Sequence, residues 1–577
     1  MSQQYLPDYQ KVIRRVGALE TERSTWWLHW KDIQQVLLPR SGRFFISDVN
    51  KGYVKNDILD DSGTAALTIL AAGMQSGMTN PSQPWVRFET QDEDLMNDAE
   101  VSRWLDQATR TVLNIFARSN FYRVVHGMYE EMGAFGTAAT IVLPDFETVA
   151  HFNALTIGEY CLAANDKNEI DTLSRSFQWT VGQIVKSFVA PTGQQRERSA
   201  SWDWSRCSPQ IKNLWDGHNE DAWIPLYQLI EPRLDFDPRK LDKKNMPWRS
   251  VYVEQGGNGR TEGDDCLYES GFRRFPVLAP RWQTTGNDIY GSTCPGMRAL
   301  GGIKQLQFEH LRKGQAIDFE TNPPLVVPAS LKNQDSDFLP GGITYTDIAG
   351  GAGGKIESAF NVNLRLDHLL LDIQDQREII KRAFFADVFM AMQSRVTGSP
   401  ITARQVEEEH QEKMLMLGPV VERTHTELLA PAADITFDYA MQAGILPPPP
   451  EQLAGQELKL EFVSVLASAQ RATAMAGVDR LIAATASIAA AKNDPSAWDN
   501  VDTDKAIQKS RIYLGVDPEI ARGESDVAKI REAREAAQQR IAQAAQAEQA
   551  ANTAKTLSEA NTGGDNALTQ VVSGFSQ

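Results

Sequence analysis

Two Glu-x-x-His pairs are the residues in this sequence best suited to chemistry: Glu407 with His410, and Glu422 with His425. On a helix this spacing puts a carboxylate and an imidazole on one face, and di-iron carboxylate enzymes use it to hold their metal ions. Those enzymes place the two pairs on different, facing helices and add two more glutamates. Here both pairs lie in one helical region, and the first is part of a highly charged run. We therefore favour a solvated helix face and keep a ferritin-like di-metal enzyme as a distant alternative.

A glycine-rich segment, IAGGAGGKI, is similar to a nucleotide-binding phosphate loop in only part of its pattern. Gly354 and Lys355 match the end of the GxxxxGK motif, but Ala349 stands where its first glycine belongs. Ile356 replaces the Ser or Thr that binds magnesium. A flexible loop is the favoured interpretation, and no nucleotide site is expected here.

Other catalytic patterns are also missing from the sequence. It has no GxSxG, and its four cysteines form no CxxC pair that would indicate a zinc site or a disulfide framework. Trp26, Trp27 and Trp30 could form a stacking platform, but at helical spacing core packing is the favoured interpretation. We therefore expect that the chain is not an enzyme and needs no metal or cofactor.

The size and charge of the chain limit the classes of protein to which it can belong. Its 577 residues are too many for one core and predict about three or four structural units. A net charge of −17 argues against a protein that coats nucleic acid tightly, although not against one past which nucleic acid must slide. No secretory leader and no membrane-spanning run is recognised, so we expect a soluble chain without membrane contact.

The first 294 residues are expected to combine helices with short strands. Apolar residues at helical spacing predict a long helix over 8–38 and three more, through Leu67–Met78, Val101–Ile115 and Tyr122–Met132. The segments ATIVL, DTLSRSFQW, LYQLIEPRLDF and SVYVE are typical of strands.

The second of these helices is unusually smooth, because small residues such as Ala71, Ala72, Gly73 and Gly77 crowd it just before Trp85. We expect such a helix to let a neighbour pack closely while Trp85 holds the following turn on a core. The sequence leaves open whether this contact lies within one subunit or between two.

Two long helices separated by an insertion follow. The segment 295–320 is expected to form one helix that begins near Pro295. The prolines of TNPPLVVP end it, and a glycine-rich stretch leads to a second helix over 362–386. The pattern predicts a helical hairpin with a large head. Beyond it come an exposed loop (MQSRVTGSPI), a helix from Thr402, a proline-rich linker, the strand ELKLEFVSV and a final Ala- and Gln-rich helix.

Several segments, taken in order, resemble the head-to-tail connecting (portal) proteins of short-tailed bacteriophages. The first is NDILDDSGTAALTILAAGMQSGMTNPSQPWVRFE, which includes Asp60, Asp61 and Pro84-Trp85. FGTAATIV, RWQTTGNDIYGSTCPGMRAL, NPPLVVP and TARQVEEEHQEKM follow. The resemblance covers about 57–540, whereas 195–265 matches nothing in the family pattern.

The resemblance implies a mainly helical α+β portal fold. Its implied parts are a wing (1–294), stem helix 1 (295–320), a clip (321–361), stem helix 2 (362–386), a channel loop with the following wing or crown helix (387–450), a C-terminal strand with a helical crown (451–523), and a helical barrel with a flexible tail (524–577).

The resemblance also implies a function. Portals form rings, usually of twelve copies, at one vertex of the capsid, where a separate terminase drives double-stranded DNA inward and the tail later attaches. The implied partners are further copies of the chain, DNA, the terminase large subunit, a tail adaptor, and the major capsid and scaffolding proteins. The implied location is the virion, after assembly in the host cytoplasm. Another virion structural protein, such as an ejection protein or a tail adaptor, is the alternative.

Candidate site residues follow from this assignment. An acidic ring should let DNA slide, with a few basic exceptions. The channel candidates are Arg395 first, then Lys304, Arg312 and Lys313. The candidates for partner binding in the clip are Pro323, Pro324, Gly341, Gly342 and Lys355.

Overall fold

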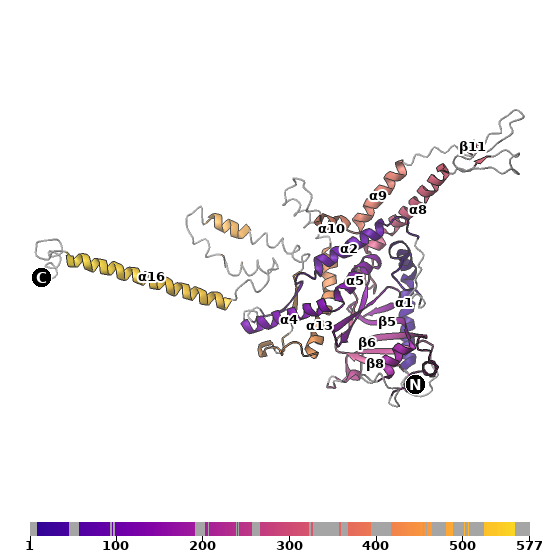
Figure 1. The fold of residues 1–577 in the computed structure, drawn as a ribbon, viewed down its shortest axis with the longest axis horizontal. Coiled ribbons are helices and arrows are strands. Elements are labelled where there is room, and N and C mark those ends of the chain that lie inside the picture. Colours follow the sequence, from indigo (N-terminus) through magenta and orange to yellow (C-terminus); the bar gives the residue numbers. More distant parts are fainter. Residues whose placement is uncertain are drawn as a thin grey trace. The chain divides into compact units, whose positions relative to one another are not determined.

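The computed structural model contains helices and sheets in two compact units (Figure 1). One unit comprises 1–88, 106–448 and 460–502, and the other 89–105, 449–459 and 503–577. The described residues are 8–45, 57–92, 95, 98–190, 202–205, 207–237, 239–240, 242–256, 266–321, 325–326, 357–358, 367–393, 417–453, 455–456, 458–463, 480–488, 501, 506 and 524–559.

A five-stranded antiparallel sheet lies at the centre of the first unit, in sequential order from β4 to β8. Its strands are β4 (Tyr160–Ala164), β5 (Ile170–Thr180), β6 (Trp223–Pro232), β7 (Trp248–Glu254) and β8 (Tyr268–Phe272). Helix α1 (Asp8–Leu37) covers one face with Val12, Val16 and Leu19. The other face packs on α6 (Val181–Ile184), η2 (Val185–Val189) and α7 (Pro209–Asp216). Alternating residues of each strand thus fill two cores.

The region 195–265, which matched no family pattern, contributes to this sheet through β6 and β7. Its tryptophans form part of the second core: Trp202 and Trp215 lie 5.7 Å apart between ring centroids, beside buried Ile211. The aromatic cluster at the start of the chain is also core, because Trp30 is fully buried and packs edge-on against Tyr290 at 5.0 Å. Core packing is therefore confirmed for Trp30, whereas Trp26 and Trp27 are half-buried beside it.

Smaller sheets and helices complete the described chain. β2 (Ala139–Asp145) pairs with β3 (Val149–Leu155) and with β9 (Val277–Leu278). β1 (Val86–Thr90) lies beside β12 (Leu458–Phe462). Further elements are α4 (Ala99–Arg118), α12 (Gly418–Thr424), the π-helical turn η5 (His425–Leu429), α13 (Ala430–Gln442) and the short 3-10 turns η3 (Lys243–Asn245) and η6 (Glu451–Leu453). In the second unit, α16 (Glu524–Glu559) is a single helix whose described side chains are nearly all exposed.

The smooth helix is α2 (Ser62–Met78), and its small residues admit neighbours from the same chain. A Cβ on Gly73 would lie 2.2 Å from Cγ of Phe389, on α10 (Ala386–Gln393). Leu67 and Leu70 of α2 also pack closely against Gly133 of α5 (Phe121–Phe135). Trp85 is buried and stacks on Phe116 and Phe121. The close packing expected from sequence is confirmed, and it is intramolecular.

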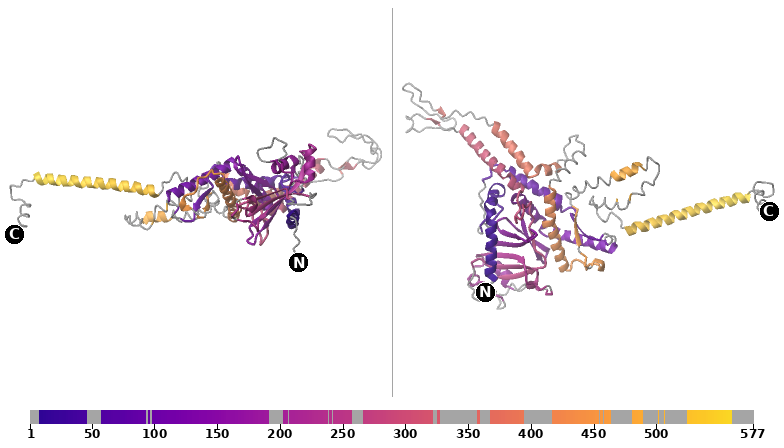
Figure 2. Two further views of the ribbon diagram at one scale, coloured as in Figure 1. Left: turned by 90° about the horizontal axis from the view of Figure 1, so that it is seen from below. Right: turned by 180° about the vertical axis from the view of Figure 1, so that it is seen from behind.

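The helical hairpin is also present. α8 (Pro295–Thr321) and α9 (Asp367–Ala383) run side by side in antiparallel directions (Figure 1, Figure 2). At the far end, Leu325 and Val326 of β10 pair with Ser358 and Glu357 of β11, so the two ends of the insertion meet. The second helix ends at Ala383 rather than 386, because Phe385 adopts a left-handed conformation (φ +55°) before α10 begins.

Candidate functional site

The α8–α9 hairpin is the candidate functional element, and its inner seam is narrow. Ile303 and Leu306 of α8 and Ile373 and Ile380 of α9 are buried. A Cβ on Gly302 would lie 3.2 Å from Oε1 of Gln376, so glycine allows the two helices to approach. The apolar seam therefore positions the two helices relative to each other.

A single buried carboxylate anchors both helices to the body. Asp60, just before α2, accepts hydrogen bonds from Nη2 of Arg377 on α9 at 2.6 Å and pairs with Nε2 of His310 on α8 at 3.0 Å. Gln307 of α8 accepts from the backbone N–H groups of Leu59 and Asp60. Burial alone would raise the pKa of Asp60, but hydrogen bonds from Ser62 and Arg377 outweigh it and lower the pKa. The carboxylate therefore remains charged and ties three segments together.

Two acidic side chains, one from each helix, face each other across the seam. Glu309 of α8 is almost fully buried, accepts from Nε2 of Gln305 at 2.7 Å, and faces Asp372 of α9. Burial raises the pKa of Glu309, and the neighbouring Asp372 carboxyl raises it further, against the hydrogen bond from Gln305. Glu309 thus lies level with Asp372, and this contact shows the register in which the two helices pack.

Three of the basic channel candidates lie on α8. Lys304 forms an ion pair with Asp32 of α1, with Nζ 2.6 Å from Oδ2. Arg312 lies over the ring of Phe308 at 4.8 Å and donates to Oε1 of Gln315 at 3.0 Å. Lys313 is half-buried. The three side chains therefore lie on one helix, and two of them, Lys304 and Arg312, already contact other residues of the same chain.

The other candidates fall outside the described residues. These are Arg395 in the expected channel loop, and Pro323, Pro324, Gly341, Gly342 and Lys355 in the expected clip. The loop with the partial phosphate motif lies outside them as well. The pairing of β10 with β11 describes only the neck of this insertion.

The Glu-x-x-His pairs are described only in part. Glu407 and His410 lie outside the described residues, and Glu422 is exposed on α12. His425 stacks face-on against Phe462, with ring centroids 4.2 Å apart. Across the residues that the structure describes, no group of three or more His, Cys, Asp or Glu side chains is arranged to hold a metal ion. In the same part of the chain, no helix combines the length and apolar character needed to cross a bilayer.

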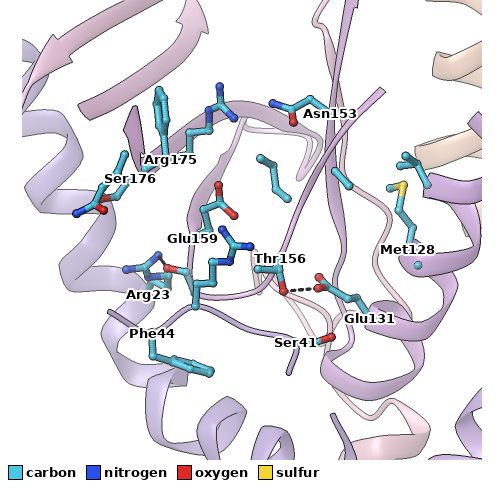
Figure 3. A pocket seen from close by; sticks show the side chains of 18 of the residues that line it. Arg23, Ser41, Phe44, Met128, Glu131, Asn153, Thr156, Glu159, Arg175 and Ser176 are labelled. Atoms are coloured by element: carbon cyan, nitrogen blue, oxygen red, sulfur yellow. Dashed lines mark hydrogen bonds between the residues drawn. The ribbon is translucent and has the colours of Figure 1, made fainter. Parts of the chain in front are cut away.

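A cavity of about 1350 Å³, lined by residues of α1, α5, β3 and β5, was not predicted from sequence (Figure 3). Its charges are largely compensated from within: Arg23 donates to the carbonyl oxygens of Gly158 and Tyr160, and Arg175 donates to Gln228. Glu131 accepts a hydrogen bond from Thr156, and burial raises the pKa of this glutamate to about 8. No sequence motif marks these residues, since they come from four separate segments.

An internal ion pair was also missed by sequence reasoning. Arg281, just before the hairpin, donates through Nε and Nη2 to Oε1 of Glu427, at 3.2 and 2.7 Å. Its backbone N–H donates to the same carboxylate, and Nη2 reaches the carbonyl of Asn168. Residues 281 and 427 are 146 positions apart, so only the fold brings them together.

Comparison with known proteins gives a consistent result. A model of the bacteriophage head to tail connecting protein family matches residues 9–521. The chain is 47% identical over 566 residues to a probable portal protein of Bordetella phage BPP-1, covering 98% of each chain. It is 39% identical over 564 residues to the portal protein of Salmonella phage epsilon15, covering 97% of each.

Among solved structures, a chain from the virion of a native gene transfer agent particle matches 72% of this chain and 95% of its own. The identity is 10% and the TM-score 0.30, too low to support an argument. The sequence relationship carries the assignment: this chain belongs to the bacteriophage head to tail connecting protein family.

Proposed function

We propose that this chain is a portal protein, which assembles into a ring at one capsid vertex through which double-stranded DNA is packaged and later ejected. The observation that carries the proposal is identity of 47% and 39%, over nearly the whole chain, to proteins named as phage portal proteins. The hairpin of α8 and α9, with its ends closed by β10 and β11, is consistent with a stem that carries a clip.

The proposal divides the chain by role. The sheets and helices before 294 form the wing, α8 and α9 the stem, and the segment between them the clip. The region from 387 to 450 supplies the channel loop and the helix behind it. The C-terminal part, including α16, forms the crown and barrel. An exposed helix with few large apolar residues is marginal alone, so packing between neighbouring copies would support α16.

DNA passage is proposed to depend on weak contact. Twelve copies of a chain with net charge −17 make a strongly acidic ring, and tight phosphate contacts would stall a sliding duplex. Arg395 and Lys313 are kept as channel candidates. Lys304 and Arg312 are considered separately below, because their surroundings favour another role.

The partners proposed for the ring are a terminase large subunit, a tail adaptor, and the major capsid and scaffolding proteins. The clip would bind the first two in turn, with Pro323, Pro324, Gly341, Gly342 and Lys355 as its candidate contacts. Assembly would take place in the host cytoplasm and the ring would remain in the virion.

Negative-stain imaging of the purified chain tests the proposal. Closed rings with a central hole are expected, and a uniform population of monomers at all concentrations would contradict the proposal. Metal analysis of the same sample gives a second check: stoichiometric iron or manganese would favour the di-metal enzyme instead.

Deletion of 330–355 tests the clip. Rings should still form, since the deletion lies beyond the β10–β11 neck, but DNA packaging should be lost. A deletion that unfolded the chain, as judged by circular dichroism, would contradict the division into stem and clip.

A further inference from the structure

The outer half of the hairpin exposes large apolar side chains. Phe308, Leu311 and Phe319 on α8 are 54%, 47% and 51% exposed, and Leu371 on α9 is 62% exposed. Exposed single residues of this kind are ordinary, but here they gather on two packed helices. The described part of the chain therefore leaves this group of apolar side chains uncovered.

On α8 these residues form one stripe. Lys304, Phe308, Leu311, Gln315 and Phe319 recur at spacings of three and four, which places them on one helix face. This face is turned away from the buried Ile303 and Leu306. Arg312 flanks the stripe with its guanidinium over Phe308. We call these six residues the α8 stripe. It carries two cations and no anion, and of the two cations Lys304 is already paired with Asp32 of α1.

On α9 a second stripe has the opposite charge. Asp367, Leu371, Asp375, Glu378 and Arg382 also recur at spacings of three and four, and all five are exposed. They lie on the face opposite Ile373, Gln376 and Ile380, the residues turned toward α8. We call these five residues the α9 stripe. It carries three acids and one cation around the exposed Leu371, and of the acids Glu378 is paired with Lys381 on the same helix.

The two stripes lie at matching levels along the hairpin. Within one chain, Glu309 of α8 faces Asp372 of α9, and Gly302 lies beside Gln376. Leu311 is therefore level with Leu371, and Lys304 with Asp375. In a ring whose axis runs parallel to the hairpin, rotation from one copy to the next keeps each residue at the same level. The apolar Leu311 of one copy can therefore meet Leu371 of the next, and Lys304 can meet Asp375.

We propose that the α8 stripe of one copy packs against the α9 stripe of the neighbouring copy in the ring. The inference rests on the proposed function, since it needs a ring. Such a contact is heterologous, and repeating it by rotation closes a ring. A contact between two α8 stripes would instead place Arg312 and Lys304 of one copy against those of another. The interface assigns both Arg312 and Lys304 to subunit packing rather than to DNA.

Cross-linking between introduced cysteines tests the contact. The variant with Leu311→Cys and Leu371→Cys, treated with a short thiol cross-linker, should give a ladder of covalent oligomers beyond the dimer. The native cysteines do not interfere, because Cys161, Cys207, Cys266 and Cys294 are all buried. Each single variant should give no ladder. The matched control pairs Leu371→Cys with Leu28→Cys, which is 76% exposed on α1, and should give no ladder either.

Mixing of two blocked variants tests the direction of the contact. Leu311→Asp blocks the α8 stripe and Leu371→Asp the α9 stripe, and each site is exposed enough that circular dichroism should be unchanged. Each variant alone should form rings at least tenfold less readily than the unmodified chain. In a mixture each variant retains the face that the other needs, so heterodimers should form but not rings.

The outcomes separate the inference from the proposed function. Rings that show no Leu311–Leu371 cross-link, or an equal ladder from the Leu28 control, overturn the interface and leave the portal assignment intact. Rings that form normally from either blocked variant overturn it too. An unmodified chain that never forms rings contradicts the proposed function itself.

Discussion

The body of the molecule and its hairpin bury their apolar residues to different extents. Around α2, large apolar side chains pack within the same chain: Leu67, Leu70, Met74 and Met78 are buried, and Phe389 fills the space left by Gly73. On the outer hairpin, Phe308, Leu311, Phe319 and Leu371 remain exposed beside a narrow seam. The core around α2 is filled from within one chain, whereas the apolar face of the outer hairpin is not covered by the described residues. Stability should therefore depend on the body, and assembly on the hairpin.

The largest loss of stability is expected from the buried ion pair of the body. Replacing Arg281 with Met leaves Glu427 without its main partner, and breaking a buried pair typically costs about 3–5 kcal/mol. Urea unfolding of the variant measures the loss. The matched control is Arg274→Ala, which breaks an exposed pair with Asp434 and should cost no more than about 1 kcal/mol. Equal losses for the two would contradict the difference in burial.

Replacing Glu131 is expected to raise the stability of the chain by an amount that depends on pH. Folding raises its pKa from 4.5 to about 8, so the folded chain keeps a proton that the unfolded chain releases. This contribution to stability is complete below pH 4.5 and is lost as the pH rises toward 8. Glu131→Gln removes the dependence and should stabilise the chain by roughly 3 kcal/mol at pH 7.

Thermal unfolding of the Glu131 variant across this pH range measures the gain. Glu130→Gln, at the neighbouring half-buried position, is the control, and it should change the pH profile far less, because its charge is the weakest of the causes that raise the pKa of Glu131. A profile for Glu131→Gln that still falls between these pH values would show that another group titrates.

A smaller loss is expected where α2 meets α10. Gly73→Ala places a methyl group 2.2 Å from Phe389, and overpacking of a core typically costs about 1–3 kcal/mol. Gly127→Ala is the matched control: it lies within α5 with nothing within 4 Å, and should be neutral or stabilise by about 0.4–1 kcal/mol. Thermal unfolding compares the two, and a neutral Gly73 variant would mean that α10 can move away from α2.

The smallest effect on stability is expected on the hairpin. Leu371→Gln changes an exposed side chain, so the free energy of unfolding of the monomer should change by no more than about 0.5 kcal/mol. Sedimentation of the same variant should nevertheless show weaker ring formation. A large loss of monomer stability would show that the hairpin is part of the body's core.

The elements of the hairpin could be predicted from the sequence because each signal is local. Pro295 starts α8, prolines follow its end, and helical spacing marks both helices. The predicted end of α9, residue 386, is three residues later than the observed end at Ala383. The left-handed turn that follows lies at Phe385, and only a glycine there would have indicated it in the sequence. The strands β3, β4, β8 and β9 were not predicted, since each takes its place only by pairing with strands from other segments.

Contacts between distant segments could not be predicted from local patterns. Asp60 was noted only as part of a family signature, and its role as an anchor depends on His310 and Arg377, far along the chain. The same holds for Arg281 with Glu427, and for the cavity around Glu131. The faces of the hairpin that remain exposed could not be predicted either, because periodicity alone does not show which face of a helix other residues cover.

Cryo-electron microscopy of the purified full-length chain tests the central claim most directly. The expected reconstruction is a closed ring in which the α8–α9 hairpins together surround the central hole. The α8 stripe of each copy contacts the α9 stripe of the next. A ring with its hairpins on the outer rim, away from the hole, would contradict this account.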